Sequence, residues 1–129
     1  MRSQYTLSLA RSFDARHFLI GGDWGDENRP HAHPYRLELR LEAAALDEHG
    51  YLVDLVEVER LLDAQVDRVR GRTLNDLPDF AGLNPSLENF ARILALALAE
   101  PLRGRGLSAV EVRVWETDSA WASYRLELE

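Results

Sequence analysis

The sequence contains no cysteine among its 129 residues. Disulfide bonds and thiolate ligands are therefore excluded, and any metal site must be built from imidazole and carboxylate groups. A cysteine base or nucleophile is excluded as well. The absence does not identify a compartment, because a cysteine-free chain fits a reducing environment and any other.

Long apolar runs and an excess of positive charge are also missing. No stretch approaches the roughly 20 apolar residues that cross a bilayer, and the N-terminus lacks the apolar core of a signal peptide, so we expect a cytoplasmic protein with no membrane partner. The net charge of −7 argues against a nucleic-acid partner, since phosphate neutralisation needs a basic surface. With 46% apolar residues and no repeat or linker, residues 1–129 are expected to form a single domain.

Three of the four histidines fall in one pattern. His17 ends an alternating segment, and His31 and His33 are two residues apart, which puts their rings on one side of an extended strand. Neutral imidazole is the commonest metal ligand, and three of them with an open fourth position are typical of a catalytic zinc site. We therefore predict that His17, His31 and His33 hold one Zn²⁺ with an exchangeable fourth position.

Apolar and polar residues alternate in four segments, as expected for half-buried strands. The first runs from Tyr5 to His17 and the second from His31 to Glu42, with a glycine-rich loop at 21–28 between them. Two more strands, at 110–115 and 124–129, close the chain.

Between these strand pairs the pattern changes to a helical period. Asp54 followed by Glu57 predicts a capping box at the start of a first helix that ends at Gly71. A second helix is predicted to begin at Asn84-Pro85, a cap residue followed by proline, and to end before Gly104. The apolar stripe of the first helix comprises Leu55, Val58, Leu62, Val66 and Val69.

The order of these elements predicts an α+β fold, a four-stranded antiparallel sheet with two helices on one face. A sheet this small has two open edges, and open edges usually need covering. Oligomerisation by edge pairing is the expected solution.

Several segments resemble the motifs of the 6-pyruvoyl-tetrahydropterin synthase and 6-carboxytetrahydropterin synthase family. His31-Ala32-His33 is similar to the family's His-Gly-His, with alanine for glycine. The other matching segments are Phe13-x-Ala15-x-His17, Gly50 to Leu55, Leu74-Asn75-Asp76, Asn84 to Asn89 and Trp115-Glu116-Thr117. The resemblance covers nearly the whole chain in order and spacing.

The resemblance implies a tunnel fold, in which three ββααββ units form a barrel and two barrels stack into a homo-hexamer with pockets between subunits. It implies that the three histidines hold zinc and that the substrate is a dihydropterin such as dihydroneopterin triphosphate. It also implies that Glu116 binds the pterin ring nitrogens. Glu116 continues the parity of the buried valines before it, where an unpaired carboxylate is costly, and this too favours a partner.

The chain departs from the family at its catalytic positions. The family's cysteine lies four residues before the first histidine of His-x-His, and Glu27 stands there. The family's Asp-His pair falls on Arg70 and Gly71 when the chain is aligned on Leu74-Asn75-Asp76. General acid–base groups contribute on the order of 10² to 10⁴ each in rate. We therefore expect little pyruvoyl or carboxy synthase activity.

Glu27 has two interpretations. In a subgroup of the family, glutamate replaces the cysteine and is associated with cleavage of the side chain to 6-hydroxymethyl-dihydropterin. A carboxylate near zinc can act as the base that this retro-aldol step requires. The alternative is that residues 26–28 are only a solvated polar loop.

Two other groups of residues are also open to two interpretations. Arg70 and Arg72 either bind an anion such as a triphosphate or form the ordinary basic end of a helix. Ser86 and Glu88 either contribute to the substrate site or cap the second helix.

Two functions lead, ahead of a different zinc-dependent reaction on another substrate, such as hydrolysis. The first is a zinc-dependent lyase acting on a dihydropterin, with Glu27 as catalytic base and with Glu116 and Ser86 in the substrate site. The second is a non-catalytic homologue that binds zinc and a pterin.

Overall fold

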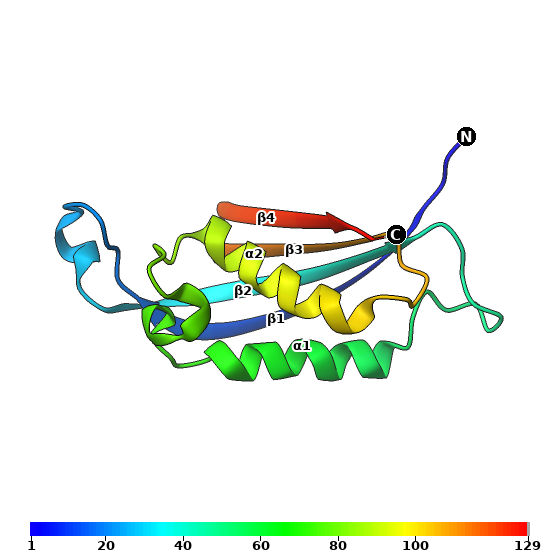
Figure 1. The fold of residues 1–129 in the computed structure, drawn as a ribbon, viewed down its shortest axis with the longest axis horizontal. Coiled ribbons are helices and arrows are strands. Elements are labelled where there is room, and N and C mark those ends of the chain that lie inside the picture. The colour runs from blue at the N-terminus through cyan, green and yellow to red at the C-terminus, as the bar shows by residue number, and fades with distance from the viewer. Residues whose placement is uncertain (129) are drawn as a thin grey trace.

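The structure, a computed structural model, describes residues 1–128 and confirms the predicted α+β fold (Figure 1). The long elements follow the order ββααββ. Their bounds are β1 (Tyr5–His17), β2 (His31–Ala43), α1 (Leu55–Val69), α2 (Leu87–Ala99), β3 (Ala109–Thr117) and β4 (Ala120–Glu127). Short 3₁₀ turns lie between them, namely η1 (Gly25–Asn28), η2 (Leu74–Asp76), η3 (Pro78–Phe80) and η4 (Glu100–Leu102).

The four strands form one antiparallel sheet in the order β1-β2-β3-β4. Both long helices lie against the same face of this sheet (Figure 1). Because successive side chains of a strand point to opposite faces, only one parity of each strand enters the core. The fully buried strand residues at its centre are Leu37, Leu39, Leu41, Val110, Val112 and Val114.

Helix α1 begins where the sequence predicts, although its capping box is only half formed. The Asp54 carboxylate accepts hydrogen bonds from the backbone N–H groups of Val56 and Glu57, at 3.0 and 3.4 Å. The carboxylate of Glu57 pairs with the Arg105 guanidinium at 2.6 Å. The prediction that Leu55 belongs to the buried stripe is wrong, since 43% of it is exposed and the stripe begins at Val58.

Helix α2 begins later than predicted. Its cap is Ser86, whose hydroxyl accepts a hydrogen bond from the backbone N–H of Asn89 at 3.1 Å. Asn84 does not cap the helix, because its side-chain carbonyl accepts a hydrogen bond from the backbone N–H of Ile20 at 3.2 Å. A tertiary contact therefore outcompetes the local capping pattern at this residue.

The outer strands leave most of their edges uncovered. The outer edge of β1 is met by the segment after α1 near Asp14 and Arg16, whose backbone groups bond to Gly71 and Arg72. No strand of residues 1–128 pairs with the outer edge of β4. In this same range no helix is both long enough and apolar enough to cross a membrane.

Candidate metal centre

The three predicted histidines meet at one end of the sheet. His17 is the last residue of β1 and lies directly opposite His31, the first residue of β2, and His33 lies opposite Ala15. The ring centroids are 4.6 to 4.8 Å apart, and one nitrogen from each ring lies within 4.8 Å of the others. The predicted convergence is confirmed, and it follows from the pairing register of β1 with β2.

In two of these rings one nitrogen is held by a hydrogen-bond partner, which leaves the other nitrogen available to bind a metal. The Nδ1–H of His31 donates to the carbonyl oxygen of Arg29 at 2.7 Å, because a carbonyl can only accept. His17 Nδ1 lies 2.8 Å from the Tyr35 hydroxyl in a buried contact. Imidazoles that bind metals are oriented in this way, through the nitrogen that does not coordinate.

The remaining nitrogens fit a cation. The Nε2 atoms of His31 and His33 are buried and have no hydrogen-bond partner among the described residues. Such atoms are costly unless something pairs with them. The donor set is three imidazoles without a thiolate, which suits zinc.

Burial sets the protonation of the groups at this centre. Desolvation lowers the pKa of His17 from 6.5 to about 4, with the neighbouring His33 and His31 as smaller causes. The ring is therefore neutral at neutral pH, as a metal ligand must be. Burial also raises the pKa of Tyr35 above its ordinary value, with Glu116 as a second cause, so its hydroxyl stays protonated.

Glu116 lies beside the histidines. Its Oε1 is 3.1 Å from His33 Nε2 and 3.8 Å from His17 Nε2, and its side chain is 28% exposed. An open groove of about 1020 Å³ begins next to it, and Arg36, Trp115 and Tyr35 are among its lining residues. Glu116 therefore contacts both the histidine cluster and a space large enough for a small molecule.

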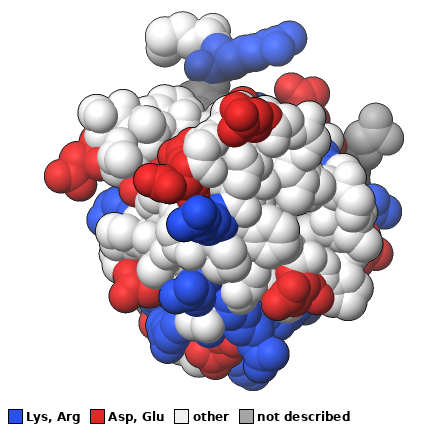
Figure 2. All heavy atoms as spheres, turned by 90° about the vertical axis from the view of Figure 1, so that its left-hand side faces the viewer, with Lys and Arg blue, Asp and Glu red and all other residues white. Residues whose placement is uncertain are grey.

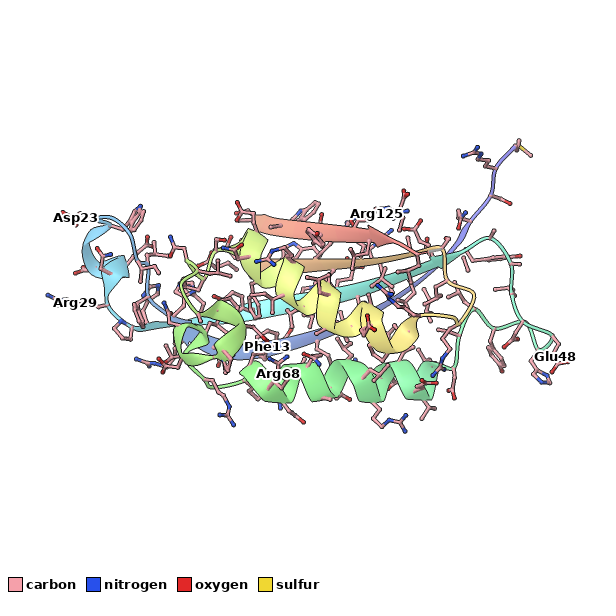
Figure 3. All side chains as sticks on the ribbon, viewed as in Figure 1. Phe13, Asp23, Arg29, Glu48, Arg68 and Arg125 are labelled. Carbon is pink, nitrogen blue, oxygen red and sulfur yellow. The ribbon has the colours of Figure 1, made fainter. Side chains whose placement is uncertain are left out.

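The loop between β1 and β2 projects beyond the sheet (Figure 3, Asp23 and Arg29). Figure 2 views this end of the molecule, where uncharged atoms cover much of the middle and positive groups gather below. Glu27 lies in this loop, in turn η1. Its side chain is exposed and has no hydrogen-bond or ion-pair partner within residues 1–128. Its predicted role as base stays a prediction.

Two asparagines anchor the start of this loop, a role that the sequence analysis missed. The Asn75 amide accepts from the N–H of Phe18 at 3.0 Å and donates to the carbonyl of the same residue at 2.8 Å. Asn84 binds the N–H of Ile20.

The sequence analysis also missed Tyr35 as a residue of the histidine cluster. Its place there was visible in the sequence, because Tyr35 shares the parity of His31 and His33 along the strand.

The other candidate residues have structural partners. Arg70 pairs with Asp67 at 3.6 Å on the exposed end of α1 and also lines the groove. Gly71 turns the chain with a φ of +70° and donates its N–H to Asp14. Ser86 caps α2, and its predicted contact with substrate stays a prediction. No carboxylate or imidazole therefore stands at positions 70 and 71.

The chain is similar to known proteins over nearly its full length. The family model described as 6-pyruvoyl tetrahydropterin synthase matches residues 6–127. A putative 6-carboxy-5,6,7,8-tetrahydropterin synthase of Archaeoglobus fulgidus is 25% identical over 125 residues, which are 97% of this chain and 99% of that protein. A dihydroneopterin monophosphate aldolase of Pyrococcus furiosus is 28% identical over 105 residues, 81% of this chain and 83% of the relative.

Solved structures share the fold. A Plasmodium vivax 6-pyruvoyltetrahydropterin synthase, in which a catalytic glutamate is replaced by alanine, superposes with a TM-score of 0.80. The two chains are 16% identical, and the match covers 98% of this chain and 99% of the other.

Proposed function

Because the chain belongs to the 6-pyruvoyl tetrahydropterin synthase family, we propose that it is a zinc-dependent lyase that shortens the side chain of a dihydropterin such as dihydroneopterin triphosphate. The single observation that carries the proposal is the convergence of three histidines, two of them oriented by hydrogen-bond partners, beside a groove and a carboxylate. A zinc ion bound there would act as a Lewis acid on a substrate oxygen.

The residues of the chain would divide the work as follows. Glu116 accepts two hydrogen bonds from the 2-amino edge of the pterin, where its charge strengthens both. Glu27, in the loop between the two histidine segments, takes the proton from a side-chain hydroxyl. Ser86 is a further candidate contact to substrate.

The expected chemistry is a retro-aldol cleavage. Glu27 removes the proton of the second side-chain hydroxyl, and that C–O bond becomes the carbonyl of an aldehyde. The C–C bond between the first and second side-chain carbons breaks, its electron pair stays on the pterin side, and a proton completes 6-hydroxymethyl-dihydropterin. No oxidant or reductant is required.

One similar protein supports the reaction class and another supports a glutamate as the base. The similar Pyrococcus furiosus protein is named a dihydroneopterin monophosphate aldolase, which is the reaction class proposed here. The Plasmodium vivax protein of the same fold has a catalytic glutamate. The lack of an acid–base pair at Arg70 and Gly71 argues against full synthase chemistry in this chain.

A hexamer, or at least a trimer, is part of the proposal. The uncovered outer edges of β1 and β4 support pairing between chains. A neighbouring chain would then close the groove beside Glu116.

Product analysis tests the function. Zinc-loaded protein is incubated with dihydroneopterin triphosphate, and the pterins are separated and identified. We expect 6-hydroxymethyl-dihydropterin, with little pyruvoyl or carboxy product. Glu27→Gln keeps the shape of the side chain and removes the base, so turnover should fall on the order of 10²-fold or more while pterin affinity changes little.

The second candidate is a non-catalytic protein that binds zinc and a pterin. It is favoured by the absence of the Asp-His pair, whose positions hold Arg70 and Gly71. It predicts pterin binding with no turnover in the wild-type chain. Full synthase activity in the wild-type chain would contradict both functions and the role given to Glu27.

A further inference from the structure

Strand β3 carries one extra residue where it reaches the histidine cluster. Trp115 pairs with Trp121 and Thr117 pairs with Ala120, so Glu116 between them has no partner on β4. A bulge of this kind bends the strand and re-aims a side chain. Here it accompanies a carboxylate that lies against the histidines instead of continuing into the apolar core.

The contact of Glu116 with His33 is too poorly aligned for a hydrogen bond. The oxygen lies 3.1 Å from His33 Nε2, yet that nitrogen has no hydrogen-bond partner among the described residues. The ring therefore directs this nitrogen elsewhere. Two ligands of one tetrahedral zinc ion lie roughly 3.3 Å apart, given zinc–ligand distances of about 2.0 to 2.1 Å. The separations of 3.1 Å from His33 and 3.8 Å from His17 are close to that spacing. Among the described residues, the ligand atoms that all lie within 4.8 Å of one another are those of the three histidines, so the Glu116 carboxylate must move toward the metal to coordinate it.

We propose that Glu116 is a fourth protein ligand of the metal in the substrate-free protein and that it leaves the metal when a dihydropterin binds. The second half rests on the proposed function. Carboxylate oxygen is an ordinary zinc ligand, and four protein ligands make a closed site without a reactive position. The free protein would therefore hold its metal in an inert form.

The pterin edge supplies the reason for the exchange. One carboxylate cannot bind the metal and also accept two parallel hydrogen bonds from the 2-amino edge of a pterin. The side chain is partly exposed and borders the groove, so it has room to turn. When the carboxylate leaves and a neutral substrate oxygen takes its place, the site loses one negative charge, which strengthens the metal as an electrophile.

Cobalt substitution tests the first half without a pterin. Co²⁺ is loaded into the wild type, Glu116→Gln, Glu116→Ala and the control Asp118→Asn, which removes an exposed carboxylate two residues away. We expect both Glu116 variants to change the visible ligand-field spectrum and to bind Zn²⁺ at least about tenfold more weakly in chelator competition, as even outer-shell partners contribute that much. The control should match the wild type. Circular dichroism checks that each variant is folded.

Adding 7,8-dihydroneopterin tests the second half. The wild-type cobalt spectrum should move toward that of the Glu116 variants, while the variants change less. The first half is overturned if all four proteins share one spectrum and one zinc affinity. The second is overturned if dihydroneopterin binds to the wild type and leaves the spectrum unchanged.

The two proposals fail in different ways. If His31→Ala loses the metal while the Glu116 variants bind it unchanged, this inference is wrong and the proposed lyase function is unaffected. If the Glu116 variants change the cobalt spectrum but the protein turns over no dihydropterin, the lyase function is wrong and Glu116 is still a metal ligand.

Discussion

Tyr35 is the residue that orients His17. It is 3% exposed, and its hydroxyl lies 2.8 Å from His17 Nδ1. Tyr35→Phe keeps the aromatic packing and removes only this contact, so we expect zinc affinity to fall about tenfold or more. Competition with a chromophoric chelator measures it.

The control for this variant is Tyr124→Phe, which removes a hydroxyl from β4 away from the histidines. It should leave zinc affinity unchanged. Equal affinity in Tyr35→Phe and the wild type would show that packing alone fixes the His17 ring.

His17 also makes the metal-free protein sensitive to acid. The unfolded chain takes up a proton on this residue near pH 6.5, whereas the folded chain resists until about pH 4. The free energy of unfolding of the metal-free protein therefore falls progressively as the pH drops from 6.5 to 4, by up to about 3 kcal/mol. Urea unfolding of chelator-treated protein across this range measures the loss.

Two variants isolate this contribution from that of the carboxylates. His17→Gln should flatten the dependence between pH 6.5 and 4, and His49→Gln, which removes an exposed histidine, should not. If the His17→Gln profile parallels that of the wild type, the acid sensitivity comes from other groups.

At the scale of elements, the loop at 18–30 is held by a side chain from η2. Asn75 pairs with both backbone groups of Phe18. Asn75→Ala leaves these partly buried groups unpaired, and we expect a loss of about 1 to 3 kcal/mol in unfolding free energy. Hydrogen exchange at the Phe18 amide should accelerate in parallel.

Asp76→Ala is the matched control, because Asp76 is exposed in the same turn. It should change neither quantity appreciably. Equal exchange rates at Phe18 in the wild type and Asn75→Ala would mean that the loop is anchored chiefly by other contacts, such as that of Asn84.

For the whole molecule, the open edges predict association. Light scattering should give three or six times the chain mass of 14.7 kDa. Along an edge strand, successive residues direct their backbone groups alternately inward and outward. Of Ala122→Pro and Ser123→Pro, one should therefore disrupt the sheet, and the other should fold yet fail to associate, because it removes only an outward donor.

A monomer mass for the wild type over a wide concentration range would contradict this prediction. The prediction would also be contradicted if both proline variants folded and still assembled. Circular dichroism separates loss of folding from loss of association.

Much of the fold was predictable because the chain's patterns are local. The alternation from Tyr5 to His17 and the parity of His31 and His33 determine both the strands and the meeting of the histidines. The start of α2 was not predictable from local capping, since Asn84 is engaged by Ile20 across the fold. The face on which Glu116 lies follows from its parity with Val110, Val112 and Val114, but its lack of a partner on β4 reflects a bulge, which alternation alone cannot reveal.

The pairing of His17 with His31 has a consequence for the unfolded chain. These residues close the loop at 18–30, so one ion bound to both would act as a cross-link across that segment. A cross-link reduces the number of conformations open to the unfolded chain and stabilises the folded one by loop-closure entropy. Lengthening the loop with glycines should therefore increase the stabilisation that such a cross-link gives, by about 0.6 kcal/mol for each doubling of its length. The metal centre would therefore act as a reversible cross-link. The stability that it adds to the folded chain would depend on the length of the loop as well as on the ligands.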